Sequence, residues 1–147
     1  MLGASSRTLS FWAKTGSTTT GALHYNGSAT AHNRFRGQLA GGTTYGIDLH
    51  TVTSPGSVTV PLDSWAHFAC TFDGDTTVLN TYVDGVLDAS TVQTQLDTGA
   101  GTFSIGRDSS NPSYPYFNGY VSDFRVYDHV LDADAMGALA SAGPLGT

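Results

Sequence analysis

Turn-forming residues interrupt the chain about every ten positions, and this spacing limits the fold more than any other feature. Asp73-Gly74 and Asp84-Gly85 are typical of tight hairpin turns, and Asn26-Gly27 and Gly41-Gly42 carry the same signal. The segments between these turns are short, and in residues 65–72 the apolar side chains alternate along the chain. This pattern predicts short strands joined by hairpins.

The expected strands are residues 8–14, 22–25, 33–39, 45–50, 57–62, 65–72, 78–83, 86–89, 102–107 and 116–127. Only the tail predicts a helix, over residues 133–140. Asp132 suits the N-cap, and Met136 and Leu139 share one helical face. Gly143-Pro144 then ends the helix.

The composition agrees with strands. All twelve acidic residues are Asp, and Lys occurs only at Lys14, so two strong helix formers are nearly absent. With 147 residues, 39% of them hydrophobic, the chain is long enough and apolar enough to form one domain with its own core. Cys70 is the only cysteine, so no internal disulfide is expected, and its thiol should be buried and inert with no cation nearby. The fold class expected for residues 1–147 is an all-β antiparallel β-sandwich with one short C-terminal helix.

Charge and hydropathy exclude two classes of function. A net charge of −6 with six Lys and Arg leaves no basic face for the phosphates of a nucleic acid. No apolar run approaches the roughly 18 residues of a membrane span. The first ten residues lack the layout of a signal peptide, so a signal was removed or export uses another route. An extracellular or virion-surface location is expected.

Three stretches resemble laminin-G-like jelly rolls. They are LSFWAK (Leu9–Lys14), WAHFACTFDGDTTVLNTYVDGVLDAS (Trp65–Ser90) and the segment Phe103–Met136 with FSIGRDSS and YFNGYVSDFRVYDHVLDADAM. The resemblance spans Leu9 to about Leu139 and implies the concanavalin-A-like group, which includes pentraxins, legume lectins, β-glucanases and adhesion modules. It specifies a fold better than a function.

The chain departs from this group at its N-terminal side. Members usually carry an outer strand that pairs with the last strand, and here it is missing or reduced to residues 1–7. Strand 119–127 should therefore present an open edge, which a neighbouring subunit could fill in a homo-oligomer or a coat-protein assembly. All three apolar residues of this strand face the core only if a β-bulge adds one residue at Ser122-Asp123. They are Val121, Phe124 and Val126.

The sequence does not predict an enzyme. Glucanases of the group use two Glu residues, and this chain has none. The pairs Asp73 with Asp75 and Asp132 with Asp134 fall at a turn and a helix start, where turn and capping roles are favoured. No Gly-x-Ser-x-Gly elbow is present, and the five His lack metal-binding spacing. His67 lies in the Trp-x-His strand, for which the resemblance implies a structural role.

Calcium remains one of two alternatives for the aspartates. Ca²⁺ takes about six to eight oxygen ligands, which Asp side chains and loop carbonyls supply. Asp123 matches the final-strand Asp that binds a structural Ca²⁺ in several members, although its usual partners come from the missing N-terminal region. Asp73, Asp75, Asp84 and Asp108 are further loop candidates. Solvated turn carboxylates explain all of these positions equally well.

Residues 109–119, SSNPSYPYFNG, form the longest aromatic loop. Sugar recognition needs flat apolar faces and a few polar groups, so we take Asn111, Tyr114, Tyr116 and Asn118 as ligand-binding candidates. In the alternative arrangement, Tyr116 and Phe117 fold back over the sandwich and leave only Tyr114 outside.

Two functions are consistent with these features. The favoured one is a non-catalytic binding or adhesion module that recognises a glycan or a surface partner. The alternative is a structural accessory of a larger assembly, such as a decoration or tail protein of a virion. Asn26-Gly27-Ser28 also matches a glycosylation sequon, but its Asn-Gly pair first predicts a hairpin turn.

Overall fold

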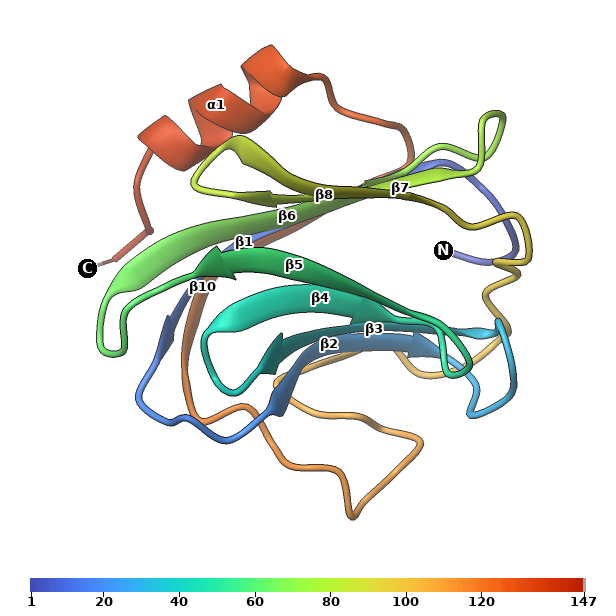
Figure 1. Cartoon of the computed structure of the whole chain (residues 1–147), viewed down its shortest axis with the longest axis horizontal. Coiled ribbons are helices and arrows are strands. Elements are labelled where there is room, and N and C mark those ends of the chain that lie inside the picture. The colour runs from blue at the N-terminus through green and yellow to red at the C-terminus, as the bar shows by residue number, and fades with distance from the viewer. Residues whose placement is uncertain (147) are drawn as a thin grey trace.

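The computed structural model describes residues 1–146, which form two five-stranded antiparallel sheets packed face to face (Figure 1). The antiparallel β-sandwich is confirmed. The first sheet has the order β10 (Gly119–Tyr127), β1 (Arg7–Thr15), β6 (Trp65–Phe72), β7 (Val78–Val83) and β8 (Val86–Val92). The second sheet has the order β5 (Thr53–Thr59), β4 (Thr44–Asp48), β3 (Arg34–Ala40), β2 (Gly21–Gly27) and β9 (Ser104–Ile105).

Alternation along the strands builds the core between the sheets. Phe11 of β1 pairs with Phe68 of β6, and both rings are buried. Full burial of one such side chain contributes about 1.5–3 kcal/mol. The second sheet supplies the facing layer from every other position of β2, β3 and β4. Its buried residues are Leu23, Phe35, Leu39, Tyr45 and Ile47.

The tight turn predicted at Asp84-Gly85 is confirmed, whereas the turn predicted at Asn26-Gly27 is wrong. Asp84 and Gly85 join β7 to β8 with φ values of 49° and 80°, as a tight two-residue hairpin requires. Asn26-Gly27 makes no hairpin, because both residues lie in β2 and the connection follows them. Gly27 is needed there because a Cβ would collide with the carbonyl of Asn33. The side chain of Asn26 is buried and donates to the Met1 carbonyl at 2.6 Å, so this sequon offers no accessible acceptor.

Strand β5 begins earlier than expected, at Thr53 instead of residue 57. It contains Pro55, which the sequence analysis placed outside any strand. The strand lies at the edge of the second sheet, where a residue without an N–H is tolerated.

The predicted β-bulge is present in β10, within one residue of its expected place. Ser10 pairs with Arg125 and Trp12 with Ser122, so Asp123 and Phe124 together oppose a single residue of β1. Asp123 has a φ of 51°, an uncommon conformation for a non-glycine residue.

The bulge brings two of the three apolar residues of β10 to the core. Phe124 stacks on Phe11 with ring centroids 5.1 Å apart, and Val121 packs against the same cluster. The prediction for Val126 was wrong, because this residue is 47% exposed. Its partner Leu9 is in the core, but β10 ends the first sheet and no described strand covers Val126 from outside.

The residues before β1 form no strand beside β10. Gly3 forms an isolated bridge with Thr98 instead of pairing with β10. Met1, Ser5 and Ser6 line a cavity of about 520 Å³ beside Val126. The outer edge of β10 is therefore open along the described chain, as expected.

Helix α1 (Ala133–Ser141) covers the outer face of the first sheet (Figure 1). The Asp132 carboxylate accepts from the Ala135 N–H at 2.9 Å, which confirms the predicted N-cap. Met136 is fully buried against Ala69 and Tyr82. Within residues 1–146, no helix has the length and apolar character needed to cross a membrane.

Cys70 is buried and unpaired, and burial raises the pKa of its thiol to about 11. The expectation that no cation lies nearby was wrong. The buried Arg7 guanidinium lies over the rings of Phe35 and Phe72 and lowers the thiol pKa, but burial outweighs this effect.

Candidate ligand-binding surface

The outer face of the second sheet carries an unusual concentration of charge. Because Phe35 and Leu39 of β3 face the core, the residues that alternate with this face point outward, and they are Arg34, Arg36 and Gln38. Asp48 of β4 is the cross-strand partner of Arg36, so its carboxylate lies on the same face.

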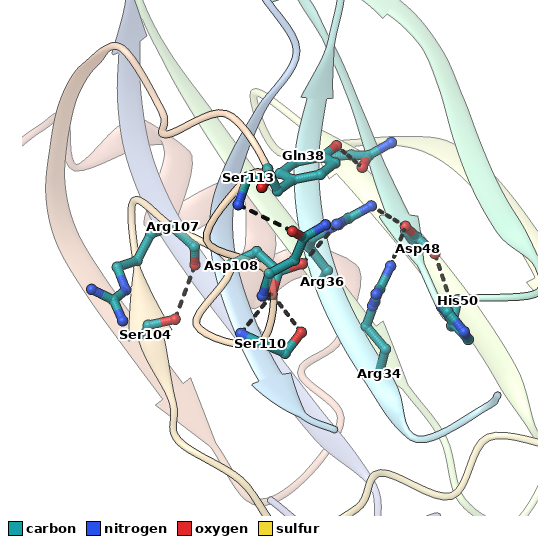
Figure 2. A network of polar contacts seen from close by, with 12 residues as sticks. Arg34, Arg36, Gln38, Asp48, His50, Ser104, Arg107, Asp108, Ser110 and Ser113 are labelled. Carbon is teal, nitrogen blue, oxygen red and sulfur yellow. Dashed lines mark hydrogen bonds and ion pairs between the residues drawn. The ribbon is translucent and has the colours of Figure 1, made fainter. Parts of the chain in front are cut away.

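These three charged groups form one buried network with Asp108, which follows β9 (Figure 2). Arg36 Nη1 donates to Asp108 Oδ2 at 2.8 Å, and Arg36 Nη2 donates to Asp48 Oδ2. Arg34 Nη1 reaches the same Asp48 oxygen at 3.3 Å. Two guanidinium groups thus balance two carboxylates, and all four side chains are at most 10% exposed.

Asp108 anchors the aromatic loop to this network. Its Oδ1 accepts from the Ser110 N–H, the Ser110 hydroxyl and the Asn111 N–H at 2.9, 2.7 and 3.1 Å. Burial raises the pKa of Asp108, but hydrogen bonds from Ser110 and Arg36 outweigh burial and hold the pKa below its usual value. Asn111 Oδ1 in turn accepts from the Ser113 N–H at 3.1 Å. The start of the loop is therefore fixed before any ligand arrives.

Tyr114 folds back onto the network. Its ring lies 3.6 Å from the Arg36 guanidinium carbon, and its hydroxyl donates to Gln38 Oε1 at 2.6 Å. Burial raises the pKa of Tyr114. Tyr114 therefore holds the loop on the sheet.

Tyr114 and Tyr116 have the reverse of the positions that the alternative arrangement gave them, because Tyr114 packs on the sheet and Tyr116 is exposed. Tyr116 is 63% exposed, whereas Phe117 packs against the core. The alternative that left only Tyr114 outside was right for Phe117 and wrong for both tyrosines. Asn118 is exposed as well, and its carbonyl accepts from Gly16 N–H at 3.1 Å. We call residues 109–119 the loop surface, which displays one aromatic ring beside several amide and hydroxyl groups.

Four of the five aspartates considered for calcium have carboxylate partners, and one of these is Asp84, whose Oδ1 accepts from the His67 N–H at 2.8 Å. Both carboxylate oxygens of Asp123 accept from Arg125, each at 2.8 Å. The hydroxyl of Thr76 and the backbone N–H of Asp75 hold the pKa of Asp73 below its usual value, as in a turn. Asp108 belongs to the network described above. Within residues 1–146, no group of three His, Cys or Asp side chains is placed to hold a metal ion.

His67 has the structural environment that the resemblance implied. Its Nε2 lies 2.9 Å from the Ser10 hydroxyl, and its ring lies against Trp12. Burial lowers the pKa of His67 to about 4. The imidazole is therefore neutral at physiological pH.

Arg34, Arg36 and Asp48 were not among the site residues predicted from the sequence. The alternation of Arg with apolar residues in RFRGQL was a usable signal, because it places both arginines on one face of a strand. The pairing of Arg36 with Asp108 was not visible, since 72 positions separate the two residues. No sequence pattern indicated a second cavity, which has a volume of about 200 Å³. Its lining consists of His32, Val52, Val92, Gln93, Thr94 and Gln95.

The two packed antiparallel sheets define a β-sandwich domain. Residues 1–136 match the family model for the concanavalin A-like lectin/glucanases superfamily, and the chain belongs to this superfamily. A search of curated proteins found no match.

Solved structures match almost the whole chain. A heptameric SAP-like pentraxin from Limulus polyphemus is 18% identical with a TM-score of 0.74, covering 99% of this chain and 75% of its own. The CBM40 domain of the Ruminococcus gnavus IT-sialidase, bound to α2,3-sialyllactose, is 20% identical with a TM-score of 0.75, at 92% and 83% coverage. Domain 4 of the extracellular arabinanase AbnA from Geobacillus stearothermophilus, solved with arabinotriose, is 21% identical with a TM-score of 0.71, at 95% and 68% coverage. At these identities the likeness shows the fold alone.

Proposed function

We propose that this chain is a non-catalytic glycan-binding module and that the loop surface contacts the sugar. The observation that carries the proposal is the exposed ring of Tyr116 on a loop that a buried ion-pair network holds in place. Two structurally similar domains were solved with bound oligosaccharides, which supports the same class of ligand here. An extracellular location follows from this function.

The geometry gives each residue a role in binding. A sugar ring stacks its C–H face on Tyr116, while the amide of Asn118 and the polar groups near Asn111 bond to hydroxyls. Arg36 and Tyr114 are positioning residues that act through the loop. Because the loop is already ordered, little conformational entropy is lost when the sugar binds.

A glycan array followed by calorimetry tests this function. We expect the wild type to bind at least one neutral or acidic glycan and Tyr116→Ala to lose about tenfold or more in affinity, which corresponds to about 1.4 kcal/mol or more of binding free energy. Tyr127→Ala, which removes a tyrosine outside the loop surface, serves as the matched control. A wild type that binds no glycan, or a Tyr116→Ala variant that binds as tightly, contradicts the proposal.

The open edge of β10 favours a second candidate function. A strand from another subunit could pair with this edge and cover Val126, as a structural accessory of a virion or other assembly would require. Size-exclusion chromatography with light scattering separates the candidates. A monomer that binds sugar supports the module, whereas an obligate oligomer that binds no sugar supports the accessory.

A further inference from the structure

Lys14, the only lysine of the chain, lies between two aromatic rings on the outer face of the first sheet. Its neighbour Ala13 is in the core, so the lysine side chain points outward. Lys14 pairs with Tyr120 of β10 on one side and with Trp65 of β6 on the other. Its Nζ is 5.0 Å from the Tyr120 ring centroid and 5.7 Å from that of Trp65.

This ammonium group has no counter-ion within residues 1–146. No described carboxylate lies within ion-pair distance of Lys14, whereas Arg34, Arg36 and Arg125 all pair with Asp. Cation–π contacts orient an ammonium but do not neutralise its charge. A ligand carboxylate could therefore pair with Lys14 without displacing an existing partner, in a chain whose net charge is −6.

The lysine adjoins the loop surface through the segment 116–120. Tyr116, Asn118 and Tyr120 are exposed, while Phe117 between them packs against the core. Gly119 pairs with Thr15, next to Lys14, at the point where the chain leaves the loop and enters β10 (Figure 1). At about 3.3 Å per extended residue, Tyr116 and Tyr120 are at most about 13 Å apart, a span that a short oligosaccharide can bridge.

We propose that Lys14, Trp65 and Tyr120 form a subsite for a carboxylate-bearing sugar at one end of the glycan surface. The exposed ring of Tyr120, 66% accessible, receives the C–H face of the sugar, and the ammonium pairs with its carboxylate. This subsite rests on the proposed function, because the segment 116–120 leads from the loop surface, next to β2 of the second sheet, to Lys14 of the first sheet. It assigns that surface to acidic polysaccharides.

The test compares polygalacturonate with its fully methyl-esterified form, which has the same backbone without the charge. We expect the wild type to prefer polygalacturonate, and the preference to fall when NaCl rises from about 0.02 M to about 0.3 M, because salt screens exposed charges. Lys14→Met keeps most of the side-chain stem and removes the charge. It should weaken polygalacturonate binding about two- to fivefold and abolish the preference and its salt dependence.

Arg107→Met is the matched control, since it removes one positive charge from an exposed residue outside the subsite. It should bind both polymers as the wild type does, and unchanged melting temperatures check that both variants fold. Equal binding of polygalacturonate by Lys14→Met and the wild type overturns the subsite. A wild type that binds neutral glycans without preferring polygalacturonate also overturns it and leaves the proposed function standing. A wild type that binds no carbohydrate of either charge contradicts both.

Discussion

Replacing Asp108 by Asn should loosen the loop surface from the second sheet. The Asp108 side chain is fully buried, and its Oδ2 faces Arg36 Nη1 at 2.8 Å. An Asn at this position still offers one oxygen to Ser110 and Asn111 but directs an NH₂ group at the guanidinium. The substitution therefore removes the ion pair while it preserves the size of the side chain.

The expected loss of stability follows from this geometry. A hydrogen bond to a charged group contributes about 1.5–3 kcal/mol, and burial places this one in the upper half of that range. Arg36 keeps its second partner, Asp48, so the cost stays below the roughly 3–5 kcal/mol of a buried charge left unpaired. We expect a loss of about 2–3 kcal/mol. For a chain of this length that lowers the melting temperature by about 4–12 °C.

Urea denaturation at pH 7 measures this difference, with Asp128→Asn as the control. Asp128 has a fully exposed side chain, so its substitution changes the net charge equally and should not move the midpoint. The Asp108→Asn midpoint should fall with an unchanged m-value. A midpoint equal to that of the wild type would refute the claim that the buried pair holds the loop.

The stability difference between the wild type and Asp108→Asn should also depend on pH. The pKa of Asp108 in the folded chain lies below its usual value, which is about 3.9 in unfolded chains. Its stabilisation is therefore complete above about pH 4 and is lost as the pH falls through the lower, folded-state pKa. The gap between wild type and Asp108→Asn should persist at pH 6 and narrow below about pH 4.

Three further predictions concern other parts of the chain. Cys70 should resist thiol reagents in the native protein and react only in denaturant, because burial raises its pKa to about 11; rapid native labelling would contradict this. Incubation with β-glucans and laminarin should release no reducing sugar above buffer, and turnover abolished by one Asp→Asn change would contradict the prediction that the chain is not a hydrolase. If Ca²⁺ binds at Asp123, millimolar Ca²⁺ raises the melting temperature and Asp123→Ala removes the shift; a curve indifferent to both EDTA and Ca²⁺ discards the metal.

Local patterns predicted the parts of the fold that depend on neighbouring residues. The β-bulge of β10 followed from three apolar residues that strict alternation could not place on one face, and the pairing of β10 with β1 places the bulge at Asp123 and Phe124. The helix start followed from Asp132, whose carboxylate needs only the N–H groups of the next turn. The sequence did not predict the exposure of Val126, because this exposure depends on whether another strand lies beside β10.

Contacts between residues far apart in the sequence determine the conformation of the loop surface, and local sequence patterns do not reveal such contacts. Tyr114 and Tyr116 are two positions apart with similar neighbours, but Arg36 and Gln38 draw Tyr114 onto the sheet. Asn26-Gly27 failed as a turn for a similar reason, since pairing with β3 keeps both residues in a strand.

The most direct test of the account is an NMR titration of ¹⁵N-labelled protein with the tightest-binding glycan from the array. We predict that the largest shifts of backbone amides fall in residues 109–120, with the Tyr116 ring protons shifted upfield or broadened. The cavity lined by His32 and Gln93 should remain unchanged. Shifts confined to that cavity, or to the outer edge of β10, would contradict the assignment of the glycan to the loop surface.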